Sequence, residues 1–168
     1  MGFEYYLILK YGQSESKSNE DEVVNLLKGI SKMGSFIRIN LRGVDEELNF
    51  SEVLEHFKKH PDDPYVGEGF SIGFSFNFKS SLDCKVPHKE YETWGYFYPS
   101  LHTEKKELRL NAASRSMIRI DKEWDNSETF LKVVLELIAK VTKCQKVALW
   151  NDMADPEEYE MEYPLKKK

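Results

Sequence analysis

The run GFSIGFSFNF at residues 69–78 restricts the fold of this chain more than any other stretch of the sequence. Its bulky residues share one parity: Phe70, Ile72, Phe74, Phe76 and Phe78. Glycine, serine and asparagine occupy the other parity. Strict alternation is the period of a β-strand with one buried face, whereas a helix would scatter these rings around its axis. The run therefore predicts a strand whose phenyl rings point into the core.

The same run contains Gly-Phe-Ser-Ile-Gly, the written form of a nucleophile elbow centred on Ser71. An elbow needs a strand before the serine, a sharp turn at it and a helix after it. Here a loop with two prolines precedes Ser71, and the alternation continues beyond it. A turn at this point would remove Phe70 and Ile72 from the common face, at a loss of about 1.5–3 kcal/mol for each side chain. We therefore predict that Ser71 is a strand residue, and we assign no catalytic residue.

The glycines on the small face of this strand have two explanations. A bulky side chain from a neighbouring strand covers them, for which Trp94, Tyr96 and Tyr98 are candidates, or they form the floor of a groove for a ligand or partner. The sequence favours the first explanation and leaves the second open.

The other patterns predict a fold of the α+β class. Strands are expected at residues 3–11, 35–42, 69–78, 94–98, 107–113, 116–121 and 146–150, and helices at 20–33, 51–60 and 125–143. This order predicts a single mainly antiparallel β-sheet of about six or seven strands, with three helices packed on one face.

Residues 1–150 are expected to form one α+β domain, and residues 151–168 an acidic C-terminal tail. Three states of this tail stay open: a disordered end, a segment that docks on a basic partner, and a segment that folds back across the protein's own arginines.

Charge and composition exclude several classes of function. The net charge is −5, and acidic and basic residues nearly balance along the body of the chain. A general nucleic-acid binder needs a net basic field, so we expect no nucleic-acid partner. We find no signal peptide and no membrane span, and the two cysteines lack the spacing of a zinc site. We expect a cytoplasmic protein without cofactor or membrane partner.

The second predicted helix carries one pattern with the spacing of metal ligands. Glu52, His56 and His60 are spaced one helical turn apart, but the glutamate that marks the zincin motif is missing. We predict no metal site.

The arginines are separated from the lysines. The chain has five arginines, and four of them fall in predicted strands, whereas the lysines concentrate on helices and loops. If these strands turn their polar faces to the side of Ser71, Ser75 and Asn77, that side is an arginine-bearing surface suited to carboxylate or phosphate groups. Cross-strand carboxylates would equally make it an ordinary solvated face. The candidate ligand- or partner-binding residues are Arg38, Arg42, Arg109, Arg119, Trp94, Tyr96, Tyr98 and His102.

Two functions remain in competition. The first is a non-catalytic protein-binding protein, for instance an immunity- or antitoxin-type inhibitor of a basic toxic enzyme, since an acidic surface attracts a basic one. The alternative is a small anionic-ligand-binding protein or a small enzyme, with an arginine-bearing groove on the sheet and His102 as acid or base. Homodimerisation through a sheet edge or the aromatic strand at 94–98 stays open.

Overall fold

The fold is described from a computed structural model of the chain. It describes residues 4–12, 19–40, 45–59, 70–77, 93–113 and 127–164. Statements below refer to these residues, which we call the described residues.

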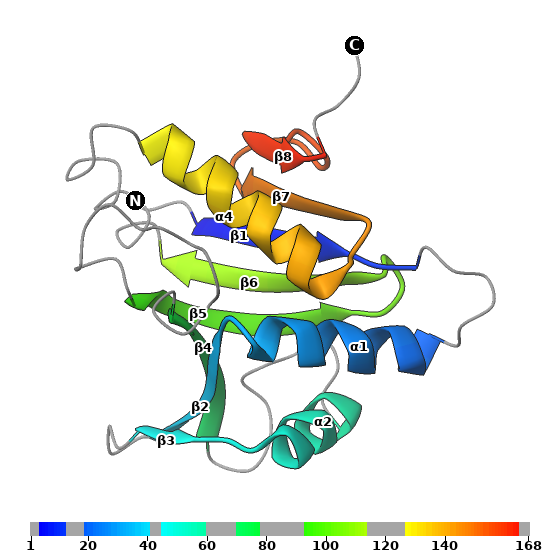
Figure 1. Ribbon diagram of the computed structural model, residues 1–168, viewed down its shortest axis with the longest axis vertical. Coiled ribbons are helices and arrows are strands. Elements are labelled where there is room, and N and C mark those ends of the chain that lie inside the picture. Colours follow the sequence, from blue (N-terminus) through cyan, green and yellow to red (C-terminus); the bar gives the residue numbers. More distant parts are fainter. Residues whose placement is uncertain are drawn as a thin grey trace.

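The described strands form one open sheet in which every paired neighbour is antiparallel (Figure 1). Their order across the sheet is β3-β2-β4-β5-β6-β1-β7-β8. The bounds are β1 Glu4–Lys10, β2 Gly34–Asn40, β3 Asp45–Glu47, β4 Phe70–Asn77, β5 Thr93–His102, β6 Glu107–Ala113, β7 Lys146–Asn151 and β8 Met161–Tyr163.

Three described helices accompany the sheet: α1 Asn19–Ser31, α2 Phe50–Lys59 and α4 Ser127–Thr142. α1 and α4 pack against each other and against one face of the sheet (Figure 1). The two helices approach closely at Gly29, where an added Cβ would lie 2.7 Å from the Cα of Thr142. α2 packs on the same face, because Phe57 meets Phe36 of β2 with 6.3 Å between the ring centres.

The predicted fold class is confirmed. The sheet has eight strands among the described residues, against the six or seven expected, because β3 is a short charged strand without alternation and β8 is a three-residue strand in the segment expected to be a tail. A capping box starts α2: the amide of Glu52 donates to Asn49 Oδ1 at 2.9 Å, and the amide of Asn49 donates to Glu52 Oε1 at 3.4 Å. The predicted strand at 116–121 lies outside the described residues.

Residues 70–77 of the alternating run form β4, and the rings of Phe74 and Phe76 lie in the core as predicted. Ile72, Phe74 and Phe76 are fully buried, and the Phe74 and Phe76 rings meet edge to face at 4.9 Å. Ser71 is the second residue of this strand and pairs with Ile39 of β2. The backbone therefore continues as a strand through Ser71, without the turn of a nucleophile elbow.

Close contact between β2 and β4 requires glycine at one position. A Cβ added to Gly34 would overlap the carbonyl oxygen of Ser75 and lie 2.9 Å from the Cα of Phe76. On the opposite side of the sheet, Gly73 faces Ile37, and its neighbour Phe74 pairs with Phe97, which puts Tyr98 on the same side as Gly73. A larger side chain therefore flanks the glycine on each side, which agrees with the first explanation for the small face.

The expected grouping of Arg38 with the small face of β4 is wrong. Arg38 pairs with Ile72 and therefore points to the helix-covered face, while Ile37 lies on the other face beside Gly73. There Arg38 Nη2 donates to Glu52 Oε2 of α2 at 3.0 Å. The reason is that β2 has apolar residues of both parities, and packing against α2 selects Phe36 for burial.

Candidate functional site

Side chains of four strands form ordered rows on the sheet face opposite the helices, which we call the open face. Directly opposed residues of antiparallel strands place their side chains on the same face, so the register defines the rows. In the order β7, β1, β6, β5, the rows are Trp150, Tyr6, Asn111, Tyr98; then Ala148, Ile8, Arg109, Ser100; then Lys146, Lys10, Glu107, His102.

A buried carboxylate lies within this face. Glu107 is only 5% exposed. Its Oε2 accepts a hydrogen bond from Arg109 Nε at 2.9 Å, and its Oε1 lies 3.7 Å from Lys10 Nζ. Burial of a carboxylate is tolerated when cations neutralise it at this range. Arg109 and Lys10 are therefore already engaged by a carboxylate of the protein itself.

The Arg109 side chain also reaches across β1 to β7. Its guanidinium carbon lies 5.7 Å from the centre of the Trp150 ring, and Tyr6 packs 5.5 Å from the same ring. Because β1 lies between β6 and β7, this contact passes over Ile8, which is 2% exposed although no described helix covers it. Long side chains of the sheet thus cover this part of the open face.

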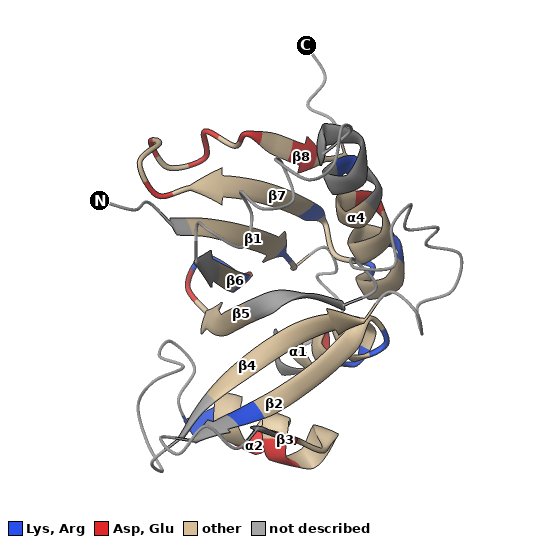
Figure 2. Ribbon diagram, turned by 90° about the vertical axis from the view of Figure 1, so that its left-hand side faces the viewer, with Lys and Arg blue, Asp and Glu red and all other residues tan. Residues whose placement is uncertain are grey.

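An acidic loop, residues 152–160, connects β7 to β8 at the end of the sheet. Its five carboxylates are exposed, and Figure 2 shows the acidic positions in red along this loop: Asp152, Asp155, Glu157, Glu158 and Glu160. Met153 of this loop is 78% exposed. Among the described residues, it is the one large hydrophobic side chain that is exposed. A single exposed apolar side chain is common on protein surfaces, and this one is surrounded by carboxylates.

Hydrogen bonds hold the backbone of this loop. Trp150 Nε1 donates to the carbonyl of Asp155 at 3.1 Å, and Asn151 Oδ1 accepts the amide of Met153 at 2.8 Å. The amide of Glu160 donates to the carbonyl of Leu149 at 2.9 Å. The loop is therefore fixed at both ends and at its centre, and its side chains project from a defined backbone.

The loop folds back on two lysines of the open face. Lys10 Nζ lies 5.5 Å from the Tyr159 ring centre and 3.8 Å from Glu157, and Lys146 Nζ lies 5.9 Å from the same ring. Burial lowers the pKa of Lys10, but Tyr159, Glu107 and Glu157 together outweigh it and raise the pKa above its ordinary value. The described part of the predicted tail thus folds back on the protein, on lysines and not on the arginines named in the sequence analysis. The predicted boundary between domain and tail, after residue 150, falls within β7.

Three of the eight candidate residues come together on the open face. Tyr98 and His102 of β5 lie beside Arg109 of β6, and Ser100 Oγ is 3.1 Å from His102 Nε2. Arg38 is separated from them, since it lies on the opposite face of the sheet.

The other four candidates are not placed as side chains. Trp94 and Tyr96 belong to β5, but only their backbone is described. Arg42 and Arg119 lie outside the described residues.

Sequence reasoning expected carboxylates such as Glu107 to neutralise the strand arginines, and Glu107 does pair with Arg109. It missed Lys10, Trp150 and Met153. The available signal was a tryptophan directly before an acidic run, which indicates that the run has an aromatic side chain to pack against.

No metal site is seen among the residues that the structure describes, which hold no group of three or more His, Cys, Asp or Glu side chains able to bind an ion. His56 is 6% exposed and meets the Phe57 ring edge to face at 5.9 Å. Within the same residues, no helix is long and apolar enough to cross a membrane.

The chain matches no protein-family model, no curated protein and no solved structure. The proposals below therefore rest on this chain's own residues.

Proposed function

We propose that this protein is a non-catalytic binding protein that docks its acidic loop on a basic surface of a partner protein. The observation that carries the proposal is the exposed Met153 among five exposed carboxylates on a loop held by hydrogen bonds. An apolar side chain that fills a pocket, surrounded by charged groups, is the usual composition of an interface centre and its rim.

Electrostatics supports a basic partner. No lysine or arginine occurs within residues 152–160, so the loop is a local concentration of negative charge on a protein that is already acidic. Such a patch steers a basic partner during encounter and raises the association rate. A loop that is ordered before binding loses less conformational entropy on docking than a flexible one.

The arginine-bearing groove is less well supported as a functional site. Arg38 and Arg109 lie on opposite faces, and Arg109 already binds Glu107 and lies against Trp150. An anionic ligand would have to compete with a buried carboxylate for this guanidinium. We therefore favour protein binding over the binding of an anion on the open face.

A basic enzyme, such as a nuclease whose substrate groove attracts anions, is the partner class that we propose. The loop would occupy that groove and inhibit the enzyme by exclusion of its substrate. A cytoplasmic location belongs to this proposal and rests on the sequence alone.

The test is comparative affinity capture from cell extract, read by mass spectrometry. The wild-type protein is compared with a loop variant that carries Asp155→Asn, Glu157→Gln, Glu158→Gln and Glu160→Gln. These side chains keep their size, and Gln can still accept the 3.5 Å hydrogen bond from Asn151 at position 160. We expect a basic protein that the wild type retains, the loop variant loses, and rising salt elutes.

A matched control carries the same charge change elsewhere: Asp21→Asn, Glu46→Gln, Glu55→Gln and Glu104→Gln, all at exposed positions. We expect this control to retain the basic protein. Equal capture by wild type and loop variant would refute the proposal, as would loss of the partner in both variants or capture of no basic protein at all.

A further inference from the structure

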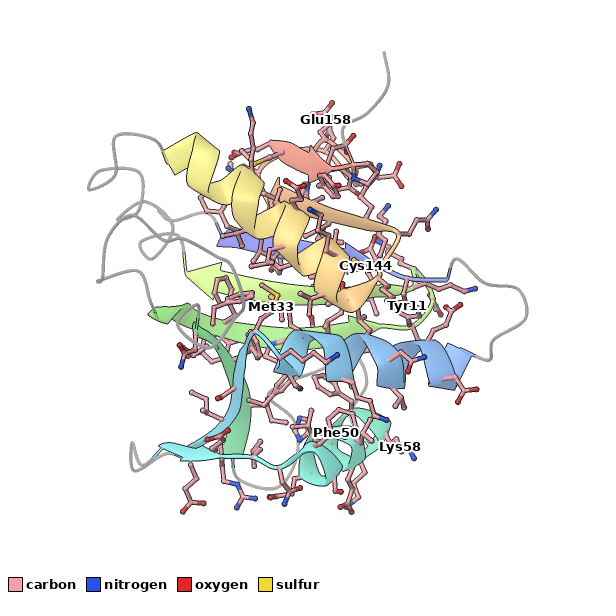
Figure 3. The ribbon with its side chains drawn as sticks, in the orientation of Figure 1. Tyr11, Met33, Phe50, Lys58, Cys144 and Glu158 are labelled. Atoms are coloured by element: carbon pink, nitrogen blue, oxygen red, sulfur yellow. The ribbon has the colours of Figure 1, made fainter. Side chains whose placement is uncertain are left out.

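A hollow of about 510 Å³ lies between α1, the C-terminal end of α4 and the segment that leads into β7. Figure 3 shows Cys144 at the end of α4 and Tyr11 near it, both above α1. The volume falls in the range of small-molecule sites. The hollow does not touch the acidic loop or the open face, and its lining includes Tyr11, Gly12, Glu22, Asn25, Lys28, Gly29, Lys32, Thr142, Lys143, Cys144 and Gln145.

The charge of the lining is opposite to that of the whole protein. Lys28, Lys32 and Lys143 line the hollow together with one acidic residue, Glu22, which leaves a net charge of +2 on a chain whose total is −5. Lys28 Nζ lies 5.8 Å from the Phe50 ring centre, and none of the three lysines belongs to an ion pair with another described residue. A hollow whose lining carries a net positive charge concentrates anions.

Two helix ends explain why lysines occur here, but they do not explain the hollow. Lys28 lies in the last turn of α1, and Lys143 follows the last residue of α4, where helix dipoles favour cations. The close packing of Gly29 on Thr142 brings these two ends together, so that lysines from separate helices border one space.

The wall formed by residues 143–145 is fixed in place. The amide of Lys143 donates to the carbonyl of Ala139 at 2.9 Å, and the amide of Gln145 donates to the carbonyl of Lys10 at 2.7 Å. Cys144 Sγ donates to the carbonyl of Lys146 at 3.6 Å. The lysine of this wall therefore projects from a rigid backbone, and exposed amides of Asn25 and Gln145 add hydrogen-bond donors.

We infer that this hollow binds a small phosphate-bearing anion. Three ammonium groups and no arginine line it. Lysines bind phosphate as point charges, and three of them around one space suit a compact anion with several charged oxygens.

Titration of the 15N-labelled protein with sodium pyrophosphate tests this inference by NMR. We expect shifts in the amides of residues 28–32 and 143–145 that saturate and that weaken with added salt. The double variant Lys32→Gln, Lys143→Gln should bind pyrophosphate at least about tenfold more weakly. Both positions are exposed, so the variant should keep the wild-type fold.

The control is Lys58→Gln, Lys59→Gln on α2, which removes two exposed lysines away from the hollow and should bind as the wild type does. Citrate at the same ionic strength is the comparison ligand and should shift these amides less. The inference fails if pyrophosphate leaves the amides unchanged, if both double variants lose binding equally, or if citrate binds as tightly.

Discussion

Replacement of Trp150 by phenylalanine removes one hydrogen bond of the acidic loop and also reduces the ring surface that Arg109 contacts at 5.7 Å. The indole Nε1 donates to the carbonyl of Asp155 at 3.1 Å, and the same carbonyl accepts the amide of Glu158 at 3.1 Å. A phenyl ring keeps the place beside Tyr6, whose ring centre lies 5.5 Å from that of the indole. The hydrogen bond reaches the loop, whereas the Arg109 contact lies on the sheet, so a change confined to the loop amides reports the loss of this bond.

The expected effect is local and moderate. A single hydrogen bond contributes about 0.5–1.5 kcal/mol net, so loss of this one should lower the free energy of local opening by about 1 kcal/mol. Hydrogen exchange of the Glu158 amide should then accelerate about fivefold. The amide of Glu160, which donates to Leu149 at 2.9 Å, is an internal control and should change little.

Two results would refute this reasoning. An unchanged exchange rate at Glu158 would mean that Trp150 does not hold the loop, and the argument for an ordered docking element would lose its basis. Equal acceleration at Glu158, at Glu160 and in the core strands would report global destabilisation, which is not what the contact predicts.

Three further predictions concern the fold. Phe74→Ala should cost about 3–5 kcal/mol in urea unfolding, because a fully buried ring is lost, and a cost below about 1 kcal/mol would contradict its place in the core. Gly29→Ala should destabilise by about 1–3 kcal/mol despite the better helix propensity of alanine, since the new methyl group would meet Thr142, and stabilisation would refute that contact. The raised pKa of Lys10 means that its charged form stabilises the folded state. This contribution to the free energy of unfolding is present below about pH 10.4 and is lost as the pH rises through the folded pKa. Lys10→Met should therefore flatten the fall in stability at alkaline pH, and identical pH profiles of the two proteins would exclude the effect.

Periodicity was sufficient to predict the elements with one buried face. β4 and the burial of the Phe74 and Phe76 rings follow from alternation alone. The short edge strand β3, Asp45–Glu47, is charged throughout and has no alternation, so only its pairing with β2 defines it.

The sequence could not predict which face of β2 is buried, because a strand with apolar residues at both odd and even positions has no intrinsic buried face. Phe36 is buried by Phe57 of α2, and this tertiary contact carries Arg38 to the helix-covered side. The order of the acidic loop depends in the same way on long-range contacts, such as that of Lys10 with Tyr159, which no local pattern encodes.

The most direct test of the proposed function is hydrogen exchange of the chain alone and in complex with the captured partner. The account predicts that residues 152–160, with Met153 at their exposed end, gain the largest protection on binding. Protection centred on another surface, such as α2, with exchange in the acidic loop unchanged, would contradict it.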